Sequence, residues 1–178
     1  MSFTNFKCLG LTGYSTDVNP LRGLLLVDAG IGHTLFRPTD TSMNICGIFK
    51  TKNFKPGALV PSPDIQTGLP TGVATMEKLY SGQIEGRSAT LFNAAFDPAS
   101  GKGAYCAMES FEGSLNGKHG KFNFIHSAAT SGKDRTEEFF SIVAGSGTGE
   151  LQNISGSGGM RIDPDGTHHI WFDVIGLS

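Results

Sequence analysis

Residues 103–129 read GAYCAMESFEGSLNGKHGKFNFIHSAA and contain two runs in which side-chain character alternates. The runs 103–113 and 121–129 are separated by the connector SLNGKHG, in which Asn116-Gly117 is a strong signal for a β-hairpin. Alternation over this length is typical of a strand with two unlike faces. The sequence therefore predicts two antiparallel strands that are joined by a tight turn.

Ionisable side chains lie on the apolar faces of this predicted hairpin. Alternation places Glu109 on one face of the first strand and His126 on one face of the second. The side chains that share these faces with them are aromatic or small: Tyr105, Ala107, Phe111, Phe122 and Phe124. If the hairpin brings the faces together, Glu109 and His126 share an apolar surface, where a buried carboxylate needs a partner and an imidazole is a natural one.

A Glu109–His126 pair is a candidate for general acid–base catalysis, and we take these two residues as the candidate catalytic residues. The alternatives are a structural ion pair or hydrogen bond, or a face that is exposed to solvent. Because structural ion pairs also perturb pKa values, the residues by themselves favour a structural pair.

Two further segments supply candidate binding residues. Lys78 and Tyr80 share a face in EKLYSG, and Lys78 is a candidate anchor for a carboxylate or an enolate, although the usual exposure of lysine favours a solvated position. Trp171 shares a face with His169 and Asp173, and either lines a pocket or belongs to the core. The predicted substrate-binding set combines these with the aromatic residues of the hairpin: Lys78, Tyr80, Tyr105, Phe111, Phe122, Phe124 and Trp171.

More strand-like runs cover the C-terminal part of the chain. They are separated by turns that contain Pro, Gly or Asp-Gly, and they lie at 72–80, 87–96, 137–145, 158–163 and 168–176. Short strands at regular spacing predict an all-β sandwich or closed barrel. We predict that residues 71–178 form one such antiparallel domain, and strand spacing alone leaves both the sandwich and the closed barrel open.

The first 70 residues are less regular and are predicted to form an N-terminal extension. Possible strands lie at 22–30, 32–38 and 43–51. The segment 56–70 holds four of the eight prolines and is predicted to be an extended linker or lid. Three placements of residues 1–70 stay open. The segment could pack on the barrel, cover one mouth of it, or build a homo-oligomer interface.

The glycine-rich stretch VAGSGTGELQNISGSGG, residues 143–159, raises the question of a phosphate-binding loop. Such a loop follows a strand, carries a Gly-Lys-Ser/Thr motif and opens a helix, and this stretch has neither the lysine nor a helical run. Glycines also permit close backbone approach at the corner of a sheet. We therefore predict a strand corner with Leu151 and Ile154 turned inward.

Composition and short motifs exclude several classes of protein. The net charge of −2 and the pI of about 6.2 give no electrostatic footprint for nucleic acid or an anionic membrane. The sequence shows neither the pattern of a signal peptide nor an apolar run long enough to span a bilayer. Cys8, Cys46 and Cys106 are interpreted as reduced thiols. Together these observations predict a cytoplasmic protein. Cys106 is predicted to be buried and inert, because no base lies near it in sequence.

No metal or cofactor is predicted. Adjacent strand residues point to opposite faces, so His168 and His169 do not ligate one ion together, and neither HExxH nor paired cysteines occur. His33 and His119 stand in turn-like contexts and are predicted to lie on the surface. No G-x-S-x-G elbow is present, which excludes an α/β-hydrolase.

Several motifs together carry a family resemblance. The chain resembles domain-of-unknown-function family 3224 over residues 71–177, through four motifs that come in the family's order: EKLYSGQIEGRS, the hairpin AYCAMESFEGSLNGKHGKFNFIHSA, GSGTGEL preceded by FFSIVA, and the closing DGTHHIWFDV. The resemblance implies an antiparallel β-barrel like that of allene oxide cyclases. It implies no established activity, although related barrels include cofactor-free cyclases, and Glu109 and His126 both match the family pattern.

Three functions are consistent with these predictions. The first is a cofactor-independent cyclase or isomerase that acts on an apolar, natural-product-like small molecule inside the barrel, where restricted geometry supplies much of the acceleration. In it, Glu109 and His126 act as acid and base while Lys78 or Tyr80 polarises a carbonyl. The alternatives are a non-catalytic binding protein for an apolar metabolite and an oligomeric barrel whose interior is packed solid.

Overall fold

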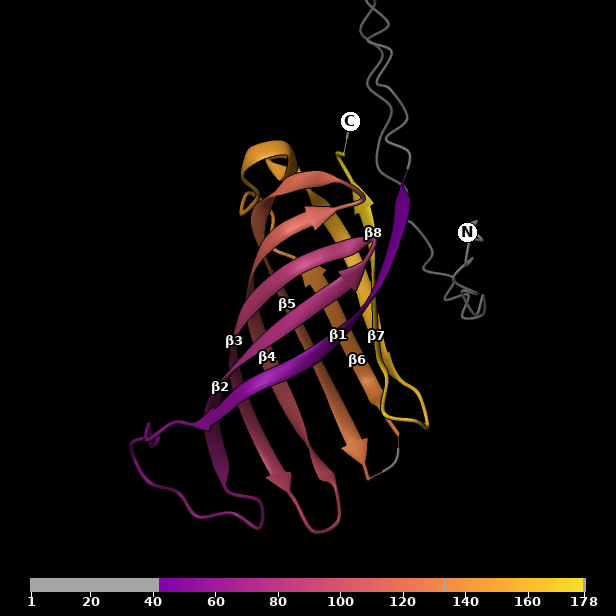
Figure 1. Cartoon of the computed structure of the whole chain (residues 1–178). Helices are drawn as coiled ribbons and strands as arrows, with labels where there is room; N and C mark the ends of the chain where they lie inside the picture. The colour runs from indigo at the N-terminus through magenta and orange to yellow at the C-terminus, as the bar shows by residue number, and fades with distance from the viewer. Residues whose placement is uncertain (1–41, 133, 178) are drawn as a thin grey trace, which may run out of the picture. The chain divides into compact units, whose positions relative to one another are not determined.

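The structure is a computed structural model, which describes residues 42–132 and 134–177 as eight antiparallel strands and one turn of 3-10 helix (Figure 1). The elements in chain order are β1 (Met43–Pro56), β2 (Thr71–Gly82), β3 (Ile84–Asp97), β4 (Lys102–Leu115), β5 (Lys118–Ser131), β6 (Thr136–Ile142), η1 (Gly149–Leu151), β7 (Ser155–Ile162) and β8 (His168–Ile175). The prediction of an all-β antiparallel fold is confirmed.

Each strand pairs with its neighbour in sequence, and β1 also pairs with β8. The hydrogen-bonded strand order therefore returns to its start, as in a closed barrel. The contact between β6 and β7 is the narrowest, with Ser141 opposite Ser157 as its single residue pair. We refer to the space that the eight strands enclose as the interior.

The sheet starts earlier than the sequence predicts. The possible strand at 43–51 is β1, whose pairing with β2 and β8 makes it part of the sheet rather than of an extension. The predicted boundary at residue 71 is therefore wrong for β1. Between β1 and β2, residues 57–70 contain neither helix nor strand, as expected for a linker. The predictions for residues 1–41 fall outside the described part of the chain.

The hairpin of β4 and β5 forms as its sequence predicts. Asn116 and Gly117 have φ angles of 50° and 83°, so both occupy the left-handed region that a two-residue hairpin turn requires. The register that follows places Phe111 opposite Phe122 and Glu109 opposite Phe124. The two apolar faces therefore coincide, and both face the interior.

Aromatic and aliphatic side chains fill the interior near η1. The rings of Phe122 and Phe124 lie 5.5 Å and 5.3 Å from the ring of Phe172 on β8, and all three side chains are fully buried. Phe111 packs against Phe122 with ring centroids 5.1 Å apart. This half of the molecule is a packed core. It supplies the hydrophobic stabilisation that a closed sheet of this size needs.

The glycine-rich stretch closes the same end. A Cβ on Gly120 would lie 2.1 Å from the carbonyl oxygen of Thr148, so only glycine lets the turn around η1 approach β5 this closely. Leu151 and Ile154 are buried in the core, as predicted. The single turn of η1 opens no longer helix, which agrees with the rejection of a phosphate loop.

Close backbone approach at Gly86 gives a prediction about stability. Gly86 has φ = 143° and lies opposite Gly113, and a Cβ there would come within 2.2 Å of the carbonyl oxygen of Glu112. Gly86→Ala should therefore lower the free energy of unfolding by about 2–4 kcal/mol through backbone strain and overpacking. Urea unfolding measures the change. Gly72→Ala is the control, because its Cβ would meet nothing within 4 Å, and it should change stability by less than about 0.5 kcal/mol.

Candidate functional site

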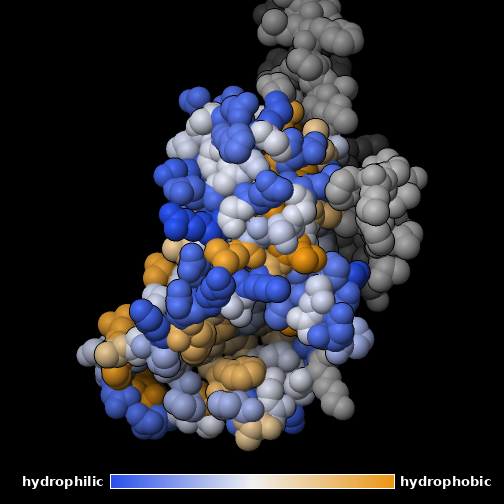
Figure 2. Space-filling view, in the orientation of Figure 1, coloured by the Kyte–Doolittle hydropathy of each residue, from blue (hydrophilic) through white to orange (hydrophobic). Residues whose placement is uncertain are grey.

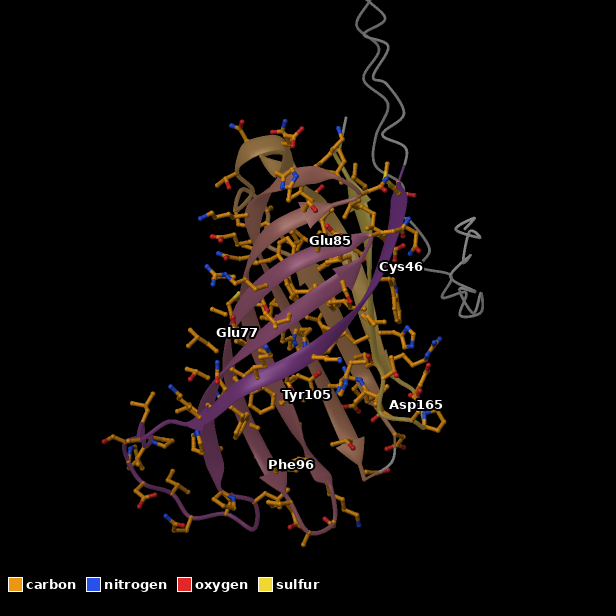
Figure 3. All side chains as sticks on the ribbon, viewed as in Figure 1. Cys46, Glu77, Glu85, Phe96, Tyr105 and Asp165 are labelled. Carbon is orange, nitrogen blue, oxygen red and sulfur yellow. The ribbon has the colours of Figure 1, made fainter. Side chains whose placement is uncertain are left out.

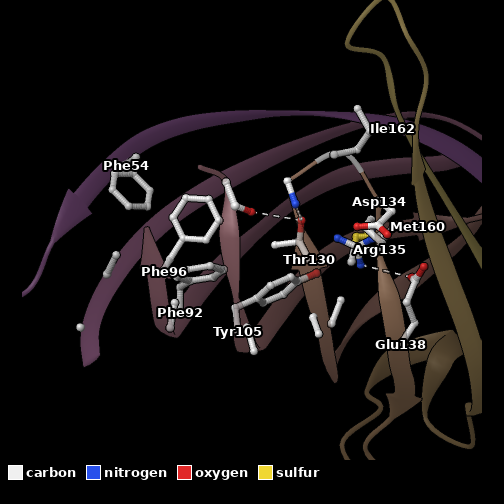
Figure 4. Close-up of a pocket in the computed structure, with 18 of the residues that line it drawn as sticks. Phe54, Phe92, Phe96, Tyr105, Thr130, Asp134, Arg135, Glu138, Met160 and Ile162 are labelled. Carbon is white, nitrogen blue, oxygen red and sulfur yellow. Dashed lines mark hydrogen bonds and ion pairs between the residues drawn. The ribbon is translucent and has the colours of Figure 1, made fainter. Parts of the chain in front are cut away.

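A cavity of about 1010 Å³ opens at the end of the interior opposite η1. Figure 2 shows hydrophobic side chains gathered toward the lower end of the face in view, and Figure 3 places Tyr105 and Phe96 at this end. The lining is mainly apolar, and its large apolar or aromatic side chains are Phe54, Phe92, Phe96, Tyr105, Met160 and Ile162 (Figure 4). Its size and character are those of a site for one small apolar ligand.

A buried polar cluster lies between this cavity and the packed core, and Glu109 is its centre. Glu109 is fully buried, with 0% of its surface exposed. One carboxylate oxygen accepts hydrogen bonds from Lys78 Nζ and from His126 Nε2, the latter at 2.7 Å. The other accepts from Tyr80 at 2.7 Å and from Ser88 Oγ. The carboxylate is therefore fully satisfied, as a buried charge must be.

Electrostatics keeps Glu109 ionised. Burial alone would raise the pKa of Glu109, but the hydrogen bond from His126 and the charge of Lys78 outweigh it and lower the pKa to about 2. Burial lowers the pKa of Lys78, while its ion pair with Glu109 opposes the change. Lys78 also lies 4.7 Å from the ring centre of Phe49, a favourable position for a cation. The cluster thus holds one buried ion pair.

His126 connects this ion pair to Tyr105. Burial lowers the pKa of His126, so its ring is neutral near pH 7. Because an ionised carboxylate can only accept, Nε2 carries the proton and donates to Glu109. Nδ1 is then unprotonated and accepts the hydrogen bond of the Tyr105 hydroxyl at 3.1 Å. The result is a continuous chain from Glu109 through His126 to Tyr105.

Tyr105 brings this chain to the cavity. It lines the cavity, and its ring stacks on that of Phe92 with centroids 5.0 Å apart. Burial raises the pKa of Tyr105, and the charge of Arg135 opposes the change. Its hydroxyl therefore stays protonated near pH 7 and is the polar group of the cluster that a ligand in the cavity can meet.

The predicted site residues fall into four places. Tyr105 lines the cavity, whereas Glu109, His126, Lys78 and Tyr80 form the buried cluster behind it. The sequence favoured a solvated Lys78, which is wrong: its side chain has a buried partner and only 4% of its surface is exposed. The predicted binding residues Phe111, Phe122 and Phe124 instead belong to the packed core and do not line the cavity.

Trp171 differs most from its prediction. Its neighbours Ile170 and Phe172 are buried in the core, so alternation directs Trp171 to the outer face of β8. There its ring covers Gly159 on β7, where a Cβ would lie 2.3 Å from it. Trp171 therefore packs on the outside of the sheet and lines neither the cavity nor the core.

Other residues of the site were missed from sequence. Ser88 faces the interior as every second residue of β3 does, and the alternation in RSATLF was a signal for it. Thr90, next on the same face, is buried and its hydroxyl has no hydrogen-bond partner among the described residues. Arg135 lines the cavity but precedes β6 in an irregular segment, which carries no periodic signal.

The cysteines and histidines also depart in part from expectation. Cys106 is a free thiol that is exposed rather than buried, because it lies on the outer face of β4. Cys46 takes part in a disulfide, so the prediction of a reduced thiol is wrong for this residue. His168 contacts Phe49, while His169 bonds Asp163 at 2.8 Å, so the two rings diverge as predicted.

Within residues 42–132 and 134–177, no group of three or more His, Cys, Asp or Glu side chains is placed to hold a metal ion. In the same part of the chain, no helix has the length and apolar character needed to cross a membrane.

Comparison with known proteins identifies one family. The profile described as "Protein of unknown function (DUF3224)" matches residues 45–174. The crystal structure of a DUF3224 protein of unknown function from Shewanella oneidensis MR-1 is similar, with a TM-score of 0.62 and 25% sequence identity. The similarity covers 75% of this chain and 97% of that one. A comparison with curated proteins finds no match.

The buried ion pair gives a prediction about stability. Lys78→Met leaves the Glu109 charge without its cation, and we expect it to lower the free energy of unfolding by about 3–5 kcal/mol. The double variant Lys78→Met/Glu109→Gln removes both charges and keeps a hydrogen-bond acceptor, so it should recover at least about 1 kcal/mol of the loss. Urea unfolding at pH 7.5 measures both.

The exposed pair of Lys121 and Glu112, 2.7 Å apart, is the matched control. Lys121→Met and Glu112→Gln should each change stability by less than about 1 kcal/mol. If Lys78→Met costs no more than these, the buried pair does not stabilise the fold.

Acid should destabilise the protein in two stages. The pKa of His126 is lowered in the fold, so the unfolded chain binds a proton more readily below about pH 6.5 and the free energy of unfolding falls as the pH decreases. Glu109, whose pKa is about 2 in the fold and 4.5 ordinarily, removes about 3 kcal/mol more as the pH falls from 4.5 to 2. Urea unfolding at a series of pH values gives the two slopes.

His126→Gln isolates the contribution of His126 to the loss of stability in acid, because an amide can keep both hydrogen bonds of the imidazole without titrating. We expect it to flatten the slope between pH 7 and 5, whereas His119→Gln, on an exposed residue, should not. An unchanged slope in His126→Gln would contradict the assignment.

Proposed function

The chain belongs to the DUF3224 family of proteins of unknown function, and we propose from its site that it binds an apolar small molecule and converts it without a cofactor. The proposed reaction is an isomerisation or cyclisation in which a proton moves on the ligand. The observation that carries the proposal is the position of the Tyr105 hydroxyl, which belongs both to the cavity lining and to the hydrogen-bonded chain that ends at Glu109.

Each residue of this chain has a distinct role in the proposal. Tyr105 exchanges a proton with the ligand, and neutral His126 takes the phenolic proton at Nδ1 as the phenolate accepts one from a ligand carbon. The imidazolium formed is stabilised by the ionised Glu109. The Tyr105 hydroxyl then gives one proton to another ligand atom, and His126 returns its Nδ1 proton to the phenolate, which completes an isomerisation and restores both residues. This arrangement assigns Glu109 to orienting His126, since a carboxyl group with a pKa of about 2 is a poor general acid near pH 7.

The shape of the cavity supports the choice of ligand and reaction. Its walls are formed mostly by aromatic and aliphatic side chains, among them Phe92, Phe96 and Met160. A flexible apolar molecule held against such walls loses conformational freedom, which favours ring closure or a shift of a double bond. No part of this proton transfer requires a metal or an organic cofactor.

Non-catalytic binding is the second candidate function. The Lys78–Glu109 ion pair and its hydrogen bonds lie behind the cavity lining, and a cluster that only stabilises the fold would be built in the same way. The cavity of about 1010 Å³ argues against the third function considered from sequence, a barrel packed solid.

Proton exchange distinguishes catalysis from binding. Apolar molecules extracted from the purified protein are returned to it in D₂O, and deuterium incorporation is followed by mass spectrometry. We expect the wild type to catalyse exchange at a ligand C–H bond and Tyr105→Phe to lower its rate by about 100-fold or more, with affinity changed by less than about threefold.

Ala94→Trp tests the location of binding, because Ala94 lines the cavity and a large ring there should abolish binding. The matched control is Ala89→Trp, on an exposed residue of the same strand. Binding that survives Ala94→Trp would contradict the proposed site. Binding by the wild type without any deuterium incorporation would establish the non-catalytic alternative.

A further inference from the structure

Arg135 is a cation in the wall of a mainly apolar cavity. It lies just before β6 and lines the cavity, and 22% of its side-chain surface is exposed (Figure 4). Its Nε is buried and has no hydrogen-bond partner among the described residues. An unsatisfied buried donor costs free energy, and such groups are uncommon in folded proteins. Arg135 is therefore a cation of the cavity wall whose hydrogen bonds are not completed by the described residues.

The contacts of Arg135 hold its guanidinium in place but leave the Nε–H donor without a hydrogen-bond partner among the described residues. One terminal nitrogen lies 3.3 Å from a carboxylate oxygen of Glu138, a long and partly exposed ion pair. The guanidinium carbon lies 5.5 Å from the ring centre of Tyr105, within reach of a cation–π contact. The guanidinium, a planar set of N–H donors, therefore lies in the cavity wall beside Tyr105. Such a set matches the two oxygens of a carboxylate.

The other charged groups in the cavity wall already have partners. Asp163 accepts hydrogen bonds from Arg161 and His169, both at 2.8 Å. Asp134 accepts from the backbone and the hydroxyl of Ser131 at 2.9 Å and 2.6 Å. Arg161, whose side chain is 60% exposed, pairs with Asp163 through its Nε. Within the wall, Arg135 is the charged group with an unused buried donor.

We infer that the ligand is an apolar molecule with one carboxylate group, which Arg135 binds beside Tyr105. The inference rests on the proposed function, since it names the ligand class of the same cavity. The carboxylate lies at the wall formed by Arg135, and the apolar part extends along Phe92 and Phe96. Tyr105 stacks on Phe92 and lies under Arg135, so the atoms next to the carboxylate come close to its hydroxyl.

Three probes with the same chain and different head groups test the inference. Decanoic acid, 1-decanol and decylamine are titrated into the protein by calorimetry at pH 7.5, where the acid is an anion and the amine a cation. We expect the wild type to bind decanoate at least about tenfold more tightly than decanol, and decylamine more weakly than either. Arg135→Gln should remove the preference for decanoate and leave decanol binding within about threefold.

Two further variants separate the role of Arg135 from the net charge and from folding. Arg87→Gln removes a positive charge from the outer face, where Arg87 pairs with Glu112, and should keep the preference. Arg135→Lys keeps the charge without the planar donors and should retain only part of it. Thermal melting of each variant shows that it is folded.

The outcomes are distinguishable. Equal affinity for decanoate and decanol, tighter binding of decylamine, or a preference that survives Arg135→Gln would overturn the carboxylate inference while leaving an apolar binding site. Absence of binding by all three probes would overturn both the inference and the proposed cavity function.

Discussion

The buried carboxylate of Glu109 is the constraint around which the interior is arranged. A charge with no exposed surface requires donors on every side, and they come from three strands besides its own: Lys78 and Tyr80 on β2, Ser88 on β3 and His126 on β5. These strands keep their relative register only if the donors stay in reach. The Glu109 carboxylate therefore holds side chains of four strands together. Its pKa of about 2 shows that these contacts stabilise the ionised form in the folded protein.

The polar cluster around Glu109 divides the interior into a packed core and an open cavity. On one side, Phe111, Phe122 and Phe172 interlock into a core that excludes solvent. On the other, small side chains such as Ala74 on β2 and Ala128 on β5 leave an open volume. The packed core and the cavity are thus separated along the strand direction. Tyr105 alone among the predicted site residues spans the division.

Alternation made the hairpin and its inward face predictable, because period and turn chemistry are local properties of a sequence. Glu109 and His126 were therefore found, together with the faces on which they lie. Depth along the interior was not predictable. It depends on how eight strands stagger, so Phe124 and Tyr105 look alike in sequence, yet one is core and the other lines the cavity.

Charge and irregular segments limited the prediction further. The burial of Lys78 follows from a partner on another strand, which no local pattern reveals. Arg135 stands in an irregular segment outside any strand, and Trp171 faces outward only because β8 directs Ile170 and Phe172 inward. Composition alone suggests an aromatic pocket around such a tryptophan, whereas the fold uses it to cover a glycine.

β6 and β7 share a single residue pair, so local opening of the sheet costs the least free energy between these two strands. Arg135 stands just before β6, and Met160 and Ile162 belong to β7, so both edges of this pairing are also walls of the cavity. Separation of β6 from β7 would open the cavity from the side, while the longer strand pairings elsewhere in the sheet stay intact. The narrowest strand pairing in the sheet thus lies in the wall of the cavity.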